Sequence, residues 1–237
     1  MNAFAGFPPE GLKFLRDLTR HNDREWFQAR KPVYEEHVKQ PMLALAAALN
    51  GDFAKFAPEY VTDPAKAVFR IYRDTRFSKD KTPYKTHIAA QFGRRDLAKM
   101  GGAGFYFSIA PEHVEAGGGA YMPSPETLRA LRARIAENHE RFQALVDAKR
   151  LRQLLGDLKG GRLTRVPKGY PPDHPAADLV RYKSLYFFIE LPGELALEPE
   201  LQPELAKRFK ALTPFLEFLN EPLAKLVASP SEPKWSK

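Results

Sequence analysis

The chain has 237 residues, of which 43% are hydrophobic and 12% aromatic, so it can bury a core and is not disordered as a whole. It contains no cysteine, which excludes disulfides, thiol nucleophiles and iron–sulfur clusters. Thirty-seven Lys and Arg against 29 Asp and Glu leave a net charge of +8, which favours an anionic partner. No apolar run reaches the roughly 20 residues of a membrane span, and the first residues do not resemble a signal peptide. We therefore expect a cytoplasmic protein that does not contact a membrane.

The first fifty residues have the pattern of helices. Leucines recur on one face after a pair of prolines at 8–9, and Asn22 or Asp23 can cap the helix that follows. The apolar stripe continues past an expected break at Pro41. Gly51 is then predicted to end this helical region, because glycine is common just past the last turn of a helix.

From about residue 67 the apolar residues alternate as in β-strands. The predicted strands of the main sheet are Ala67–Arg73, Thr86–Phe92, Gly104–Ala110 and Ser184–Leu191. Two shorter strands are expected at His113–Ala116, before the three glycines 117–119, and at Leu163–Val166. Short connections between sequential strands favour antiparallel pairing, since parallel neighbours need a long crossover.

Helices return at Ser124, which has the properties of an N-cap because proline and glutamate follow it. No internal repeat and no clear linker divides the chain. We therefore predict one α+β domain over residues 1–228, with a central, mainly antiparallel sheet flanked by N-terminal and C-terminal helices. Residues 229–237 are expected to form a polar tail.

The densest charge lies in the segment FRIYRDTRFSKDKTPYK, residues 69–85. Between Lys66 and Lys85 the sequence has seven basic side chains and two acidic ones. Strand alternation followed by a turn would bring several cations to one edge of the sheet, where a phosphate or carboxylate could neutralise them. The candidate ligand-binding residues of this segment are Arg70, Arg73, Asp74, Arg76, Lys81, Tyr84 and Lys85. The alternative is a solvated hairpin whose arginines pair with its own aspartates.

A second candidate segment is the proline-rich stretch 163–187, which is stiff enough to hold side chains in place. Its candidate ligand-binding residues are Lys168, Tyr170, His174 and Lys183. Asp173 beside His174 could tune a general base, although Asp-His-Pro is more often a turn. The three glycines before Ser124 could likewise cradle an anion or form a hinge, and the pattern is a weak indicator of either.

Several chemical classes find no support in the sequence. The six histidines are scattered without metalloprotease or zinc-finger spacing, although a magnesium ion bound by carboxylates is compatible with the chain. There is no serine-hydrolase elbow and no classical nucleic-acid-binding motif. No pattern indicates a cofactor, a particular reaction or an oligomeric state.

Taken in order, these segments resemble the domain of unknown function 2461 family, which occurs in bacteria and fungi. The resemblance rests on the arginine-rich segment 69–85, a glycine-rich turn into Tyr121-Met122-Pro123, and a Pro-Lys-Gly-Tyr loop leading to Arg181–Ser184. It covers most of the chain. It implies a single domain and a shared site built from distant segments, and it implies no particular activity, substrate or cofactor.

Three functions fit these observations. The first is a site for a small phosphorylated or otherwise anionic ligand, with or without turnover. The second is a nucleic-acid-binding module in which Tyr72, Tyr84 or Tyr170 stacks on bases. The third is a structural or interaction protein whose basic cluster forms internal ion pairs. We favour the first, because the positive charge outside Lys66–Lys85 is spread thinly over the rest of the chain.

Overall fold

The computed structural model describes residues 4–98 and 101–228, with side chains as far as residue 224. Four strands form one antiparallel sheet in the order β1-β2-β3-β4, with helices on both sides of it. The strands are β1 (Ile88–Gly93), β2 (Gly104–Ile109), β3 (His113–Ala120) and β4 (Leu185–Pro192). This confirms the predicted α+β class with a central antiparallel sheet.

The chain divides into two compact units, each assembled from three segments. Unit 1 consists of Met1–Phe92, Phe105–Gly117 and Ile189–Lys210, and unit 2 consists of Gly93–Gly104, Gly118–Phe188 and Ala211–Lys237. The chain passes between the units within each of the four strands and within the last helix, α9 (Leu201–Ala228). A single domain over residues 1–228 stays a prediction, and the expected tail at 229–237 lies outside the described residues.

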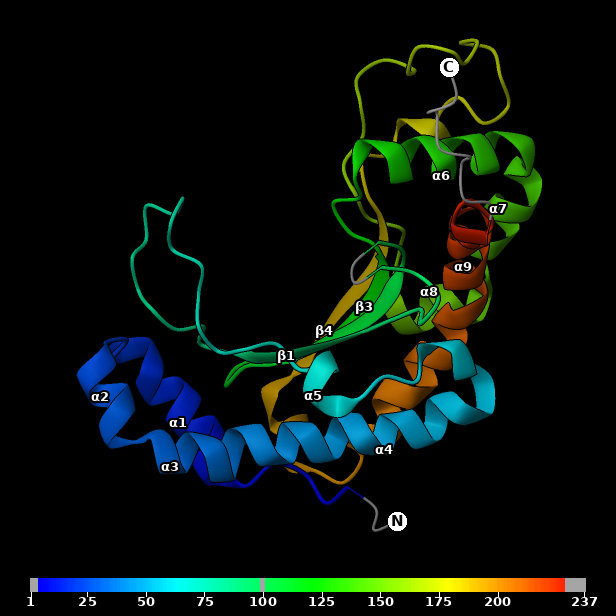
Figure 1. Cartoon of the computed structure of the whole chain (residues 1–237). Coiled ribbons are helices and arrows are strands. Elements are labelled where there is room, and N and C mark those ends of the chain that lie inside the picture. Colours follow the sequence, from blue (N-terminus) through cyan, green and yellow to red (C-terminus); the bar gives the residue numbers. More distant parts are fainter. Residues whose placement is uncertain (1–3, 99–100, 229–237) are drawn as a thin grey trace, which may run out of the picture. The chain divides into compact units, whose positions relative to one another are not determined.

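Unit 1 begins with a series of helices (Figure 1). They are α1 (Pro9–Arg20), α2 (Arg24–Ala29), α3 (Lys31–Tyr34), the π-helix η1 (Glu35–Lys39), α4 (Gln40–Phe56), the 3₁₀ turn η2 (Pro58–Tyr60) and α5 (Pro64–Ala67). A further 3₁₀ turn, η4 (Gly193–Leu197), follows β4. Asp23 is the N-cap of α2, since its carboxylate accepts from the Trp26 N–H at 2.8 Å.

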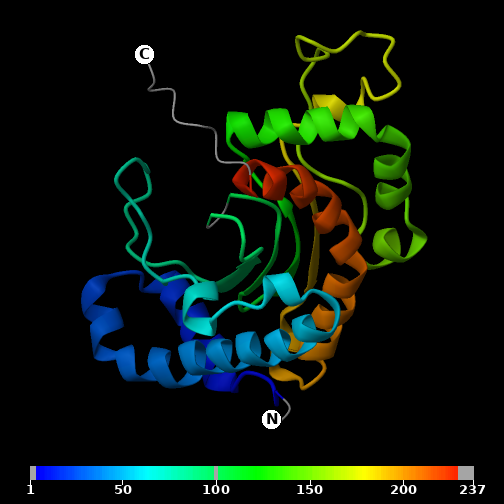
Figure 2. The same ribbon diagram turned by 45° about the vertical axis from the view of Figure 1, so that its right-hand side comes forward.

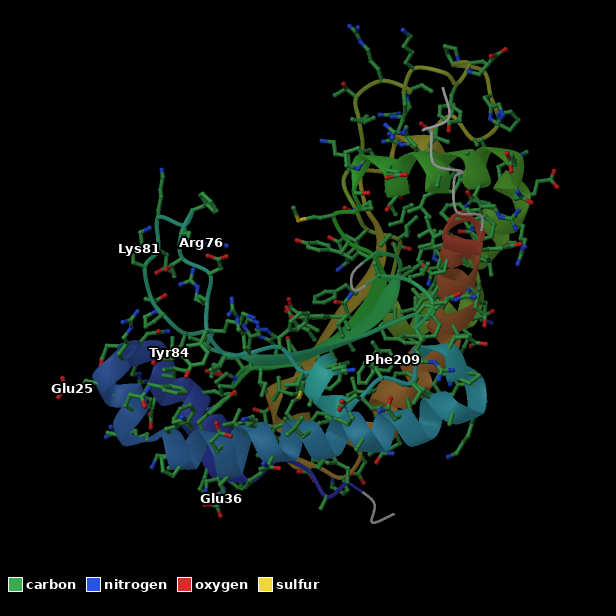
Figure 3. All side chains as sticks on the ribbon, in the orientation of Figure 1. Glu25, Glu36, Arg76, Lys81, Tyr84 and Phe209 are labelled. Carbon is green, nitrogen blue, oxygen red and sulfur yellow. The ribbon has the colours of Figure 1, made fainter. Side chains whose placement is uncertain are left out.

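The core of unit 1 contains phenylalanines of two helices and of two strands. Phe53 of α4 stacks on Phe105 of β2 with ring centroids 4.9 Å apart. The same ring meets Phe92 of β1 at 4.9 Å and Phe209 of α9 at 5.8 Å (Figure 3). All four side chains are fully buried. Alternation in β2 thus directs Phe105 toward α4, which anchors the sheet on that helix.

The helical region does not stop where the sequence predicted. It continues through Pro41 by way of the π-turn η1, and α4 runs through Gly51 to Phe56. Pro41 has no N–H to donate to the carbonyl of His37, four residues earlier. Gly11 of α1 lies against that carbonyl, where a Cβ would be far inside van der Waals contact. Gly51 does not end α4 because the residues after it stay helical and bury Phe53 in the core.

The predicted strand Ala67–Arg73 is also wrong as a strand of the sheet. Ala67 ends α5, and the segment after it pairs only through isolated bridges, Val68 with Ala90 and Tyr72 with Tyr84. Between these bridges one chain advances four residues and the other six, so two extra residues interrupt the ladder. The segment is therefore an extended but irregular arm beside β1.

Unit 2 contains α6 (Pro125–Glu137), α7 (His139–Val146), α8 (Lys149–Leu155), the 3₁₀ turn η3 (Leu179–Arg181) and the later part of α9 (Figure 2). Ser124 is the N-cap of α6 as predicted, since its hydroxyl accepts from the Thr127 N–H at 3.1 Å. Phe215 of α9 packs against Phe142 of α7 at 6.0 Å and against Phe187 of β4 at 5.0 Å. None of the helices within the described ranges is long and apolar enough to cross a membrane.

Two local predictions in unit 2 need correction. The glycines 117–119 do not follow a strand but lie inside β3. Gly119 has a φ of +142°, and a Cβ there would collide with the Leu185 carbonyl of the neighbouring strand, so the close strand approach requires glycine. Leu163–Val166 is not a strand, because pairing is limited to a single bridge between Arg162 and Tyr182.

Candidate functional site

The basic segment forms a loop, which we call the basic loop (residues 73–83). It is closed at its base by the Arg73 N–H, which donates to the Pro83 carbonyl at 2.9 Å. In Figure 1 it projects from the rest of unit 1 as the teal segment before β1. Arg76 and Lys81 lie on the projecting part, and Tyr84 lies at the base near the helices (Figure 3). The turn that the sequence predicted here is therefore present.

Two arginines of the basic loop pair with its own aspartates. Arg76 forms a fork with Asp74, with Nε 3.0 Å from Oδ1 and Nη2 2.8 Å from Oδ2. Hydrogen bonds from Arg76 lower the pKa of Asp74 to about 2. Arg73 bonds to Asp80 and Thr82. The N–H and hydroxyl of Thr82, followed by Arg73, lower the pKa of Asp80 to about 2. These contacts are the internal ion pairs expected of a hairpin whose arginines pair with its own aspartates instead of with a ligand.

Tyr84 and Lys81 hold the shape of the loop. Tyr84 is 2% exposed, and its ring stacks on Phe27 with centroids 4.0 Å apart. The amide of Asn22 bonds to both the N–H and the carbonyl of Tyr84, each at 3.0 Å. Lys81 donates to the Thr75 carbonyl at 2.9 Å. Tyr84 therefore anchors the base of the loop, and its ring is not available for a ligand.

Arg70 and Lys85 form a pair of cations, which we call the cation pair. The Lys85 Nζ donates to the Arg70 carbonyl at 3.2 Å and lies 5.2 Å from the centre of the Phe69 ring. Burial, followed by the charge of Arg70, lowers the pKa of Lys85. Within residues 4–98 and 101–224 neither cation has a salt bridge. Arg70 also lies in the field of Asp74, whose two oxygens already accept from Arg76.

A polar cluster that the sequence reading missed lies on the face of β2 and β3 opposite the aromatic core. Ser108 is 1% exposed, and its hydroxyl donates to the Glu115 carboxylate at 2.6 Å across the two strands. The Nε2 atom of His113 lies 3.8 Å from the other oxygen of Glu115. Polar residues at alternate positions of two otherwise apolar strands were the sequence signal for this cluster. We call these three residues the Glu115 cluster.

His87 connects the Glu115 cluster with the cation pair. It is half-buried just before β1, and burial lowers its pKa. The charge of Glu115 acts in the opposite direction, while Lys85 and His113 lower the pKa further. His87 thus lies in the electrostatic fields of both groups. Burial therefore favours the neutral form of His87, and the charges of Glu115 and Lys85 act on it in opposite directions.

The candidates of the proline-rich segment lie in unit 2. His174 accepts the Ala176 N–H on Nδ1 at 3.0 Å, so one ring nitrogen serves the local turn. Burial raises the pKa of Tyr170, which lies in the field of Arg132. Lys168 and Lys183 are exposed. The expected approach of these residues to Arg70 and Lys85 stays a prediction, because the two groups belong to different units.

Metal binding finds no ready-made site in the described part of the chain. Among residues 4–98 and 101–228, no three His, Asp or Glu residues are grouped so that they could hold a metal ion.

One comparison decides the family of the chain. The model of the family described as "Conserved hypothetical protein (DUF2461)" matches residues 10–218. The chain belongs to this family. No match was found among curated proteins or among solved structures. The DUF2461 match covers every candidate residue from Arg70 to Lys183, and its description assigns no activity.

Proposed function

We propose that this DUF2461 chain binds a small anionic ligand, phosphorylated or carboxylated, through Arg70 and Lys85. The proposal rests mainly on the cation pair: the Lys85 ammonium donates to the Arg70 backbone carbonyl, and neither cation has a salt bridge within residues 4–98 and 101–224. The charge of Arg70 adds to burial in disfavouring the charged form of Lys85, and an anion between the two would offset that cost. Lys85 is partly desolvated, which strengthens a charge-assisted hydrogen bond to an anion.

The other basic residues have supporting roles in this proposal. The ion pairs of Arg73 and Arg76 shape the basic loop, and His87 offers a neutral donor or acceptor beside the anion. Most of the net positive charge lies in the short segment Lys66–Lys85, which favours a small ligand over a polymer. A cytoplasmic location remains part of the proposal, because it suits a cysteine-free sequence.

Removal of either cation should weaken the binding of inorganic phosphate. Each charge-assisted hydrogen bond contributes roughly 1.5–3 kcal/mol, so we expect Arg70→Ala and Lys85→Ala each to raise the Kd by about tenfold or more. Isothermal titration calorimetry at constant ionic strength measures this. Arg76→Ala is the matched control, because it removes the same charge from the same segment but from a side chain that Asp74 already occupies. An equal loss in all three variants would indicate a diffuse charge effect and contradict the proposal.

A second function, nucleic-acid binding, is favoured by one observation. Phe77 is 94% exposed on the basic loop, and the Arg76 guanidinium carbon lies 5.7 Å from the centre of its ring. An exposed aromatic ring among cations is suited to stacking on an unpaired base.

Substitution of Phe77 tests this second function. Stacking contributes about 1–3 kcal/mol per base, so Phe77→Ala should weaken binding of a single-stranded oligonucleotide by about fivefold or more. Fluorescence anisotropy at two salt concentrations measures the affinity and the number of phosphates contacted. Phe77→Tyr is the control that keeps a ring. Equal affinity of Phe77→Ala and the wild type would argue against nucleic-acid binding by the basic loop.

A further inference from the structure

Two large apolar side chains are exposed to solvent directly after β3, and we call them the apolar corner (Tyr121 and Met122). Tyr121 is 65% exposed and Met122 is 75% exposed. Met122 has a φ of +46°, in the left-handed region that residues other than glycine rarely adopt. Its N–H donates to the hydroxyl of the buried Ser184 at 3.1 Å, which holds the chain in this conformation. An unfavourable backbone conformation that displays two apolar side chains indicates a contact surface.

The ring of Tyr121 lies on the same face of β4 as a lysine side chain. It meets the Tyr186 ring edge to face with centroids 5.4 Å apart, so this neighbour leaves at least one face of Tyr121 uncovered. Lys159 pairs with Tyr186 in an antiparallel bridge, and its N–H donates to the Tyr186 carbonyl at 2.8 Å. Paired residues direct their side chains to the same side, and the Lys159 ammonium lies 5.7 Å from the ring centre of Phe188, two residues further along that face. An aromatic ring and a cation thus both lie beside Tyr186 on one surface.

Lys159 begins a segment of positive charge without carboxylate partners, which we call the cationic run (residues 159–168). The run contains four basic residues and no acidic one, and all four are exposed: Lys159, Arg162, Arg165 and Lys168. None of them forms a salt bridge within residues 4–98 and 101–224, and Asp157, just before the run, pairs with Arg152 instead. The Arg162 guanidinium lies over the Tyr182 ring, 4.5 Å from its centre, and donates to the Tyr182 hydroxyl at 2.6 Å. The positive charge outside Lys66–Lys85 is therefore concentrated here rather than evenly spread.

We propose that this surface of unit 2 binds single-stranded nucleic acid, with a base stacked on Tyr121 and phosphates bound along the cationic run. Successive exposed cations suit the repeated charges of a phosphate backbone, and every base offers a flat face to an exposed ring. A peptide of acidic residues alone would satisfy the cations but would provide no such partner for Tyr121. The apolar corner and the cationic run both belong to unit 2, so the inference does not depend on the cation pair or the basic loop of unit 1.

Two single strands that differ only in their bases test the inference. They are a short oligothymidylate and a strand of the same length in which every nucleotide is abasic, so the number of phosphates is equal. Because stacking on an aromatic ring strengthens binding, we expect the oligothymidylate to bind the full chain about fivefold or more tightly, as measured by fluorescence anisotropy at fixed salt. Equal affinities would show that charge alone attracts the strands and would overturn the inference, as would the absence of binding by either strand.

Tyr121→Ala tests the residue that is assigned to the base. We expect it to abolish the preference: the affinity for oligothymidylate falls by about fivefold or more, while that for the abasic strand stays within about twofold. Tyr121→Phe is the matched control, because it keeps the ring and should keep the preference. Persistence of the preference in Tyr121→Ala would refute the role of Tyr121. Loss of the preference in Phe77→Ala instead would assign the base to the basic loop and would equally contradict the inference.

The salt dependence of the affinity tests the cationic run. Each phosphate neutralised on a single strand contributes about 0.7 to the slope of log affinity against log salt, so Lys159→Ala and Arg162→Ala should each reduce the slope by about that amount. Arg20→Ala is the charge-matched control, because Arg20 is exposed at the end of α1 in unit 1. An equal reduction in all three variants would indicate a diffuse effect of net charge and would contradict binding along the run. The comparison of the two strands on the wild type remains decisive even if a variant fails to fold.

Discussion

Replacement of Asn220 by alanine should lower the free energy of unfolding by about 2–6 kcal/mol. Asn220 is fully buried in α9. Its amide accepts the Ala103 N–H at 2.8 Å and donates to the Ala103 carbonyl at 2.8 Å. Alanine would leave both backbone groups buried without these partners, and each such group costs about 1–3 kcal/mol. Urea denaturation followed by circular dichroism measures the change.

Asn50→Ala is the matched control for this prediction. Asn50 bonds in the same double fashion to the N–H and carbonyl of Thr62, at 3.0 and 2.6 Å, but in a partly exposed position. Water can replace the lost amide there, so the expected loss is about 1 kcal/mol. Equal losses in the two variants would mean that burial does not determine the cost.

Replacement of Gly11 by alanine is the second change with a large expected effect. Gly11 lies in the first turn of α1, and a Cβ added there would lie 2.2 Å from the carbonyl oxygen of His37. Both partners are backbone, so the clash is relieved only by moving α1 away from η1. Because overpacking of this kind costs typically 1–3 kcal/mol and sometimes more, we expect Gly11→Ala to lower the unfolding free energy by about 3 kcal/mol.

Gly51→Ala is the control for the steric argument. Gly51 is also a helical glycine, but nothing lies within 4 Å of the position its Cβ would take. Alanine has a higher helix propensity than glycine, so this variant should gain about 0.5–1 kcal/mol. Thermal unfolding of both variants compares the signs directly. A gain in stability for Gly11→Ala would contradict the close approach of α1 to the carbonyl of His37.

Three asparagine side chains each join two segments that are separated in the sequence. Each binds both the N–H and the carbonyl of one distant residue: Asn22 with Tyr84, Asn50 with Thr62, and Asn220 with Ala103. The partners are 62, 12 and 117 residues apart in the chain. At the sequence level Asn22 was only a candidate helix cap, because capping is the one local role that its neighbours indicate.

The sequence by itself determined the α+β class, the extent of β2, the N-cap at Ser124 and the family, because these depend on periodicity and on residues a few positions apart. It also located the basic segment. It failed at Ala67–Arg73, where β-forming residues are present but the pairing register breaks, and at Gly51, where packing of Phe53 overrides a local stop signal.

Only the tertiary structure decided what the charged residues of the candidate site do. Arg76 forms an ion pair with Asp74, whereas Arg70 forms no salt bridge in the described part of the chain. The sequence could not distinguish the two arginines, because both lie within a few residues of Asp74. The sequence did not indicate Glu115 or His87 as site residues, since β3 and the segment before β1 belong to one sheet only after the chain has folded. Ion pairing and desolvation depend on distances in space over a few ångströms, and those distances are set by strand register and helix packing rather than by order in the chain.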